Sequence, residues 1–228
     1  MSVLIRRADP DDIYAIANIA ASALAVGVNA DAPWLRQRIT GGLTLVADRR
    51  DEVVGFVDAF FTSDRSGRRR LELDLLAVAA SSRGRGIGGQ LLAKCLAIAA
   101  DSDAREIRAL VRSQNEAMQR LCGRHGFCRS PVSYDLYIAE PKPGAREMQS
   151  HEASLIPVET LAYRGVWLEG TLSQNAIDAA HLIARRQEAS RLGALISAAE
   201  RPSAQLLRLN FFVNVGAYHW WTFSLESD

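Results

Sequence analysis

The sequence predicts an α/β (α+β) fold: a mixed central sheet with flanking helices, followed by a smaller C-terminal βαβαβ unit. Apolar segments of strand length alternate along the 228 residues with amphipathic segments of helical length. A glycine-rich stretch, Ser82–Gly89, separates an apolar run at Leu71–Ala80 from an amphipathic run at Gln90–Ala100. The order of elements from residue 71 to residue 138 also recurs near the C-terminus, which indicates a second unit of related design.

The first 140 residues contain the larger set of elements. Asp9 and Pro10 predict a helix start, because a proline in the first turn and acidic side chains near the N-terminus favour helices. Gly126 is expected to end the last helix of this part. The run Arg68–Arg70 is expected to be a solvated hairpin end, with a binding role as the alternative. The expected strands are 3–7, 43–47, 53–61, 68–78, 107–111 and 127–138, and the expected helices are 10–24, 33–39, 87–100 and 115–125.

The remaining residues repeat part of this order. We expect a linker at 141–154, since Pro141–Gly144 is rich in proline and glycine. Strands at 161–168, 192–196 and 217–225 then alternate with helices at 174–189 and 203–215. Gly126 and Gly216, which end corresponding helices, lie 90 residues apart. We therefore predict domains at 1–140 and 155–228, the second being a degenerate half-repeat of the first; the alternative is an unrelated α+β tail.

Composition restricts the classes of function. The net charge of +1 argues against nucleic acid as a main partner. The three cysteines and four histidines show no disulfide or metal-ligand spacing, so we expect no metal. No apolar run reaches membrane-spanning length, and the expectation is a cytoplasmic protein without a membrane partner. The preference for arginine over lysine favours a GC-rich genome, and we expect a bacterial protein.

The glycine-rich stretch is the main candidate for a binding site. Glycines permit positive φ and close approach of a ligand, and the first amides of a helix favour anions. Arg83 and Arg85 add positive charge. The stretch therefore predicts a pyrophosphate site, and a tight turn with solvated arginines is the alternative. Its Gly84-x-Gly86-x-x-Gly89 spacing matches the dinucleotide fingerprint, but the preceding strands and helices argue against that fold. No Gly-Lys-Ser/Thr follows, which excludes a nucleoside-triphosphate loop.

The spacing Arg83-x-x-Gly86-x-Gly88 resembles the coenzyme A signature of the GCN5-related N-acetyltransferase (GNAT) superfamily. Leu76-Ala77-Val78 stands where that family has "LAV" at the end of the preceding strand. Asn115 begins the fourth helix, and Gly126-Phe127 matches the family's "GF" pair. The order of elements over residues 1–140 is similar as well. The resemblance implies the mixed central sheet of acyl-CoA N-acyltransferases.

The resemblance also implies acetyl-CoA as cosubstrate and an amine as acceptor. The signature strand and the strand at 107–111 would diverge, and the pantetheine arm would enter between them. The implied cofactor-binding residues are Leu76, Ala77, Val78, Arg83, Gly84, Arg85, Gly86, Ile87, Gly88 and Asn115. For Asn115, a plain helix N-cap is the alternative.

Direct transfer needs a base for the amine and an acid for the leaving thiolate. Strand alternation predicts that Glu72, Asp74, Leu76 and Val78 share one face. Glu72 stands at a position that resembles the glutamate base of histone-type members, and Asp74 lies one pleat nearer the thioester. The alternative is a polar strand face without a catalytic role.

The fourth helix departs from the family pattern. Cys122 follows Leu121 where many members carry a tyrosine general acid. Cys122 can be an acid, a nucleophile or a small buried hydrophobe. If Cys122 is a buried hydrophobe, the general acid would be water, Tyr134 or Tyr137, or the reaction would have no general acid.

Two hypotheses result. The first is an N-acetyltransferase that moves an acetyl group to a primary amine of a small molecule or protein by direct attack. The second is a coenzyme A-binding regulatory or assembly module without turnover. The C-terminal unit is expected to cover the acceptor side or to form a homodimer. Trp220 and Trp221 place one ring on each face of the last strand, for core packing or an interface.

Overall fold

A computed structural model describes residues 3–143 and 153–226. The helices are α1 Ile13–Leu24, α2 Pro33–Gly41, α3 Ile87–Ala100, α4 Glu116–Arg124, α5 Gln174–Arg186 and α6 Arg201–Leu209. The strands are β1 Leu4–Arg7, β2 Leu43–Asp48, β3 Val53–Ser63, β4 Arg69–Val78, β5 Glu106–Arg112, β6 Cys128–Arg129, β7 Tyr134–Ala139, β8 Ala153–Glu159, β9 Arg164–Gly170, β10 Arg191–Ser197 and β11 Val213–Ser224. Most of the predicted linker, 141–154, lies outside the described residues.

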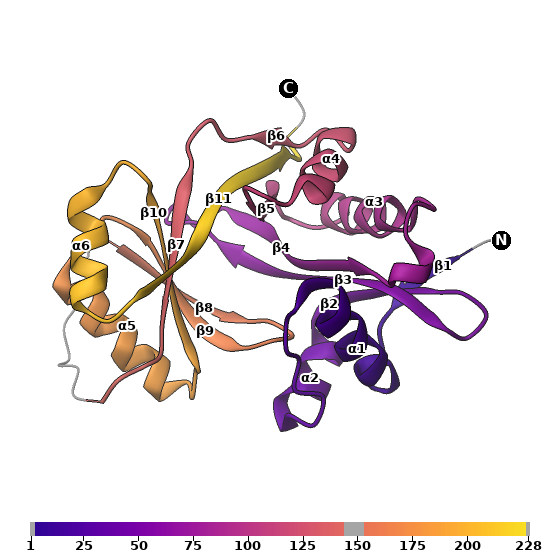
Figure 1. The fold of residues 1–228 in the computed structure, drawn as a ribbon, viewed down its shortest axis with the longest axis horizontal. Coiled ribbons are helices and arrows are strands. Elements are labelled where there is room, and N and C mark those ends of the chain that lie inside the picture. Colours follow the sequence, from indigo (N-terminus) through magenta and orange to yellow (C-terminus); the bar gives the residue numbers. More distant parts are fainter. Residues whose placement is uncertain (1–2, 144–152, 227–228) are drawn as a thin grey trace.

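One mixed sheet connects both halves of the molecule (Figure 1). Its strand order is β1-β2-β3-β4-β5-β11-β7-β10-β9-β8, with β6 paired to β11. In the first half, α3 and α4 cover one face of the sheet and α1 and α2 cover the other. In the second half, α5 and α6 pack on β7, β9 and β10. The predicted mixed α/β fold is therefore confirmed.

Each half contains the same βαβ crossover. In the first half, β4 and β5 are parallel and α3 connects them; in the second, β9 and β10 are parallel and α5 connects them. An antiparallel strand precedes each unit, β3 beside β4 and β8 beside β9. The second half thus repeats the topology of the first from β3 to β7.

The last strand of each half completes the other half's sheet. From Tyr218 to Ser224, β11 pairs with β5, although β11 belongs to the C-terminal half. In return β7, from the N-terminal half, pairs with β10 between Tyr134 and Ala139. The two units therefore share one continuous set of backbone hydrogen bonds instead of packing as separate bodies.

Two elements of the second half differ from the sequence prediction. The predicted strand 161–168 corresponds to β9, which begins at Arg164, and β8 was not predicted; it is an edge strand, which tolerates Pro157. The predicted helix 203–215 ends at Leu209, because Phe211 takes a φ of +66°. The β-branched Val213 and Val215 then belong to β11, in agreement with their preference for strands.

A search of the described residues finds no helix with the length and apolar character needed to cross a membrane. The same residues contain no cluster of histidine, cysteine, aspartate or glutamate that could hold a metal ion.

Candidate active site between the two halves

Strands β4 and β5 diverge after four paired residues. Their register runs from Arg70 opposite Glu106 to Leu73 opposite Ala109 and then stops. A bulge in β4 explains the divergence: Leu73 pairs with Ala59 and Leu75 with Asp58, so Asp74 has no partner on β3. A bulge bends its strand and ends regular pairing.

The divergence opens a cleft of about 930 Å³, which we call the β4–β5 cleft. Its lining residues include Leu76, Ala77, Val78, Arg83, Asn115 and Tyr218.

The bulge also corrects the predicted strand face. Leu71 and Leu73 pack on the α3 side of the sheet, and so do Leu76 and Val78 beyond the bulge. Glu72 lies on the opposite side, because it falls between Leu71 and Leu73 in regular strand. The prediction that Glu72 shares a face with Leu76 and Val78 is therefore wrong, since the extra residue reverses the alternation.

The glycine turn lies between the end of β4 and the start of α3. Gly84 and Gly86 have φ values of +73° and +76°, and a Cβ at either would meet no atom within 4 Å. Glycine is therefore needed here for its backbone conformation and not for space. Within the described residues, the amides of Gly84, Arg85 and Gly86 donate to no backbone carbonyl. With the first amides of α3, which begins at Ile87 and continues through Gly88, they form a group of free donors.

Arginines and Asn115 surround this turn. Arg83 lines the β4–β5 cleft and its Nε donates to the carbonyl oxygen of Val78 at 3.1 Å. Arg85 is exposed, with a 3.5 Å contact to the carbonyl of Ser81. Asn115 caps α4, its Oδ1 accepting from the amide of Met118 at 3.1 Å. Asn115 is therefore a helix cap and also lines the cleft.

Glu72 lies in a buried ion cluster. Its carboxylate accepts from Arg70 Nε at 2.8 Å and Arg108 Nε at 2.7 Å. Thr62 Oγ1 donates to it at 2.6 Å. Glu169 of β9 binds the same two arginines from the second half. Arg70 is therefore buried, and the prediction that it belongs to a solvated hairpin end is wrong.

Asp74 has a very different environment. Across the described residues it has no hydrogen-bond or ion-pair partner. Burial is the main cause that raises its pKa, to about 8, and the charge of Asp58 adds to the rise. Asp58 itself is occupied, because Arg38 Nη2 donates to it at 2.9 Å. Asp74 is thus a carboxyl group whose pKa suits proton transfer near neutral pH.

Asp74 also borders a second, more enclosed space. This cavity of about 310 Å³, which we call the junction cavity, lies between the two halves. Its walls include Asp74, Tyr163, Trp167, Leu195, Tyr218 and Trp220. Leu73, Asp74, Leu110 and Tyr218 line both the junction cavity and the β4–β5 cleft. The two spaces therefore meet at Asp74 and Tyr218.

The family comparison agrees with this geometry. A model described as "Acetyltransferase (GNAT) family" matches residues 13–127, half of the chain. The chain belongs to the GNAT acetyltransferase family. The matched segment contains the glycine turn, Asp74 and Asn115, and ends before the second half begins.

Individual relatives cover different shares of the chain. L-2,4-diaminobutyric acid acetyltransferase of Shouchella clausii (strain KSM-K16) is 40% identical over 77 residues, 34% of this chain and 42% of that protein. The chain thus spans about two fifths of the length of this curated relative. The structure of yncA, a putative acetyltransferase from Salmonella typhimurium with its cofactor acetyl-CoA, has a TM-score of 0.50 and 25% identity over 58% of this chain and 83% of that one.

A second solved structure matches the chain from end to end. A tandem GNAT protein from the clavulanic acid biosynthesis pathway covers 100% of both chains, with a TM-score of 0.59 and 12% identity. At that identity the match shows the fold alone. It shows that the GNAT fold of this chain continues through the half-repeat.

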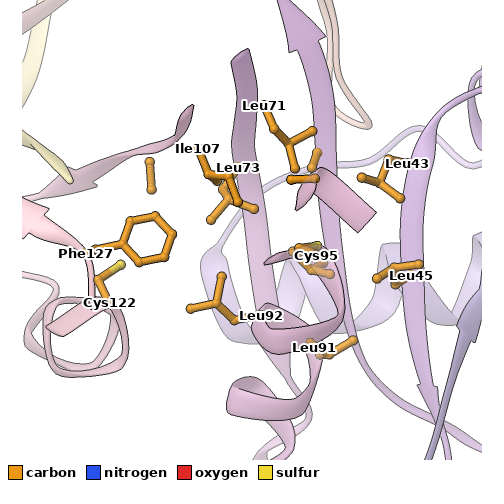
Figure 2. Packing of buried hydrophobic residues seen from close by; sticks show 14 of the residues in the cluster. Leu43, Leu45, Leu71, Leu73, Leu91, Leu92, Cys95, Ile107, Cys122 and Phe127 are labelled. Carbon is orange, nitrogen blue, oxygen red and sulfur yellow. The ribbon is translucent and has the colours of Figure 1, made fainter. Parts of the chain in front are cut away.

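The structure places Cys122 away from the β4–β5 cleft and the junction cavity. Its side chain is fully buried and lies beside Phe127 in the core cluster (Figure 2). It lines neither the junction cavity nor the β4–β5 cleft, and burial raises the pKa of its thiol to about 12. As a catalytic candidate Cys122 is therefore corrected to a core residue. Tyr134 and Tyr137 also line neither space, and Tyr137 is buried.

Sequence reasoning missed Tyr218. This residue of β11 lies opposite Arg112 of β5, and Arg112 Nε donates to its hydroxyl at 3.2 Å. Tyr218 reaches the first half's site because β11 pairs with β5. Alternation does place Tyr218 and Trp220 on one face of the strand, but no local pattern indicates which strand lies beside it.

Proposed function

We propose that this protein is an acetyl-CoA-dependent N-acetyltransferase that acetylates the primary amine of a small molecule by direct attack. The observation that carries the proposal is the junction at Asp74. The β4–β5 cleft, which Arg83 of the glycine turn lines, meets the enclosed junction cavity there, beside a carboxyl group of raised pKa. The acetyl-CoA bound by yncA and the acetyltransferase name of the curated relative support this reading.

The cofactor-binding residues of the proposal are those around the β4–β5 cleft. The amides of Gly84, Arg85, Gly86, Ile87 and Gly88 would hold the pyrophosphate, because unpaired amides at a helix N-terminus favour anions. Leu76, Ala77 and Val78 on one wall and Asn115 on the other would contact the pantetheine arm. When bound, acetyl-CoA supplies the thioester that is attacked.

Asp74 is the proposed base. A carbon–nitrogen bond forms between acetyl group and amine, and the amine's proton passes to the Asp74 carboxylate. The raised pKa, about 8, makes that carboxylate a stronger base than a solvated aspartate. Glu72, the other predicted base, is held by Arg70 and Arg108, so we assign it a positioning role in the wall of the cavity.

Tyr218 is the proposed acid. As the carbon–sulfur bond breaks, the leaving thiolate needs a proton, and Tyr218 lines both the cleft and the cavity. The hydroxyl accepts from Arg112 and keeps its own proton for donation. A residue of the second half would thus replace the tyrosine that α4 lacks.

We further propose that the units 1–140 and 155–228 together form one active site. The exchange of β7 and β11 between the two units supports this. The bacterial cytoplasm as the compartment stays a prediction. A homodimer stays a prediction, and so does the absence of nucleic-acid and membrane partners.

Thiol release from acetyl-CoA, followed with a panel of primary amines, tests the proposed function. We expect release that depends on the amine, and an acetylated product by mass spectrometry. Acetyl-CoA binding without release for any amine would instead identify a coenzyme A-binding module without turnover.

A further inference from the structure

Resting on the proposed function, we propose that the acceptor is a primary amine on an apolar, ring-sized body that carries no carboxylate. The junction cavity is its site. Four features of the cavity favour this substrate class: its size, the chemistry of its walls, the pairing of its charged groups, and the position of Asp74.

The junction cavity admits a small molecule. Its volume of about 310 Å³ is at the lower end of the range for small-molecule sites. Both halves form its walls, with Leu110 and Trp220 on the β5 and β11 side and Trp167 and Leu195 on the β9 and β10 side. A site closed in this way favours a compact acceptor over a lysine on a folded protein surface.

The walls of the cavity are mostly apolar and aromatic. The indole N–H of Trp167 is already used, because it donates to the Tyr163 hydroxyl at 3.2 Å. Trp167 also packs edge-on against Phe60, with ring centroids 5.7 Å apart. The Arg108 guanidinium packs on Trp220, 4.0 Å from the ring centroid. These rings are thus held in place to contact an apolar or aromatic ligand body.

The charged groups of the lining are paired, with one exception. Glu72 and Glu169 both bind Arg70 and Arg108. Arg191, the one cation among the described lining residues, binds Glu140 at 2.9 Å. Asp74 is the exception, without an ion-pair partner in the part of the chain that the structure describes.

This pattern selects for an amine and against a carboxylate. A ligand ammonium or amine group can approach Asp74, where it also meets the cofactor cleft. A ligand carboxylate would lie among Glu72, Asp74 and Glu169 with no unpaired cation to receive it. Burial of a carboxylate in an enclosed site without a cation to pair with it disfavours binding strongly. An amino acid, such as the diaminobutyric acid in the name of the curated relative, therefore fits this cavity poorly.

The test uses two pairs of acceptors that differ only by a carboxylate. The first pair is 2-phenylethylamine and phenylalanine; the second is 1,3-diaminopropane and 2,4-diaminobutyric acid. We expect kcat/KM for thiol release to be highest with 2-phenylethylamine and at least about 100-fold lower with phenylalanine. Within the second pair the diamine should also exceed the amino acid, and both should fall below 2-phenylethylamine.

A variant pair tests the cavity itself. Trp167→Ala should lower kcat/KM for 2-phenylethylamine by about 10-fold or more, without changing the affinity for acetyl-CoA. Trp34→Ala is the matched control, because Trp34 of α2 does not line the junction cavity, and it should leave both values unchanged. An equal loss in both variants would contradict this use of the cavity.

Separate outcomes overturn the two proposals. If either amino acid equals or exceeds its decarboxylated partner while thiol is released, the acceptor class is wrong and the acetyltransferase function stands. Higher activity with 1,3-diaminopropane than with 2-phenylethylamine overturns the apolar body in the same way. Acetyl-CoA binding by calorimetry without thiol release for any amine overturns the proposed function, and the acceptor class with it.

Discussion

The turn before α3 and the turn before α5 occupy the same place in two copies of one topology. They differ in whether the first backbone amides of the helix have a hydrogen-bond partner. Before α3, Gly84 and Gly86 adopt positive φ and leave amides free. Before α5, Ser173 caps the helix, its Oγ accepting from the amide of Ala176 at 3.2 Å. A helix N-terminus needs a partner for its amides, and a side chain or a bound anion can be that partner. Both halves therefore keep the fold, and the proposed anion site belongs to the first half.

The largest expected loss of activity follows from removing the proposed general base, Asp74, in the first half. Asp74→Asn should lower kcat/KM by about 1,000-fold, because an amide cannot accept the amine's proton. In the unchanged protein kcat/KM should rise with pH through about 8, the pKa of Asp74, as the carboxylate forms. Thiol-release assays from pH 6 to 9 measure both effects. A variant that keeps its activity, or the same inflection, would remove Asp74 from the mechanism.

Asp74 should also change how the free energy of unfolding depends on pH. The pKa of Asp74 rises from 3.8 to about 8 on folding, so between these values the native state keeps a proton that the unfolded state has lost. Stability contributed by this group therefore falls as pH rises from about 4 to 8. Asp74→Asn should gain about 1–3 kcal/mol over the unchanged protein at pH 8 and little at pH 4. Denaturant unfolding at the two pH values tests the sign.

The next effect tests whether the second half takes part in the chemistry. Tyr218→Phe should lower kcat by about 100-fold, because the leaving thiolate loses its proton donor, while acetyl-CoA affinity stays unchanged. Cys122→Ala is the control: it should reduce stability, as expected for a buried core residue, and leave kcat within a few-fold. The reverse pattern, with kcat lost in Cys122→Ala alone, would restore Cys122 as the acid.

A smaller loss, of coenzyme A affinity, should distinguish the turn before α3 from the turn before α5. Gly86→Val should weaken coenzyme A binding by about 10-fold, because a β-branched residue disfavours the φ of +76° that presents the free amides. Gly170→Val is matched to it, since Gly170 has a φ of +101° at the end of β9, ahead of α5. Both variants should lose stability, but only the first should lose affinity. Equal losses of affinity would contradict the difference between the turns.

The smallest effect is confined to the second half. Ser173→Ala should cost about 1 kcal/mol of stability, since the cap of α5 is lost. Acetyl-CoA affinity and kcat should not change. Calorimetric binding and thermal unfolding of this variant give the two readouts, and a clear drop in affinity would place a ligand at α5.

Local patterns predict much of this molecule from the sequence. The glycine turn, the N-cap at Asn115 and the spacing of apolar residues on α3 depend on neighbours within a few positions, and the structure has each of them. The bulge at Asp74 is different, because it depends on the register between β3 and β4. That one-residue shift explains why Glu72 and Leu76, two pleats apart, lie on opposite faces.

The second half shows the same limit at longer range. The repeat was predictable because the same order of strand and helix patterns occurs twice along the sequence. The exchange of β7 and β11 was not, because each strand pairs with a partner far away in the sequence. Tyr218 and the junction cavity follow from that exchange, so the acid and the acceptor site had no signal in the residues around them.

The central claim is that one of two related turns binds a diphosphate and the other does not. Calorimetric titration of the whole protein with coenzyme A measures this most directly. One molecule bound per chain, with affinity weakened by Gly86→Val and not by Gly170→Val, is the predicted result. Two molecules per chain, or no binding at all, would contradict it.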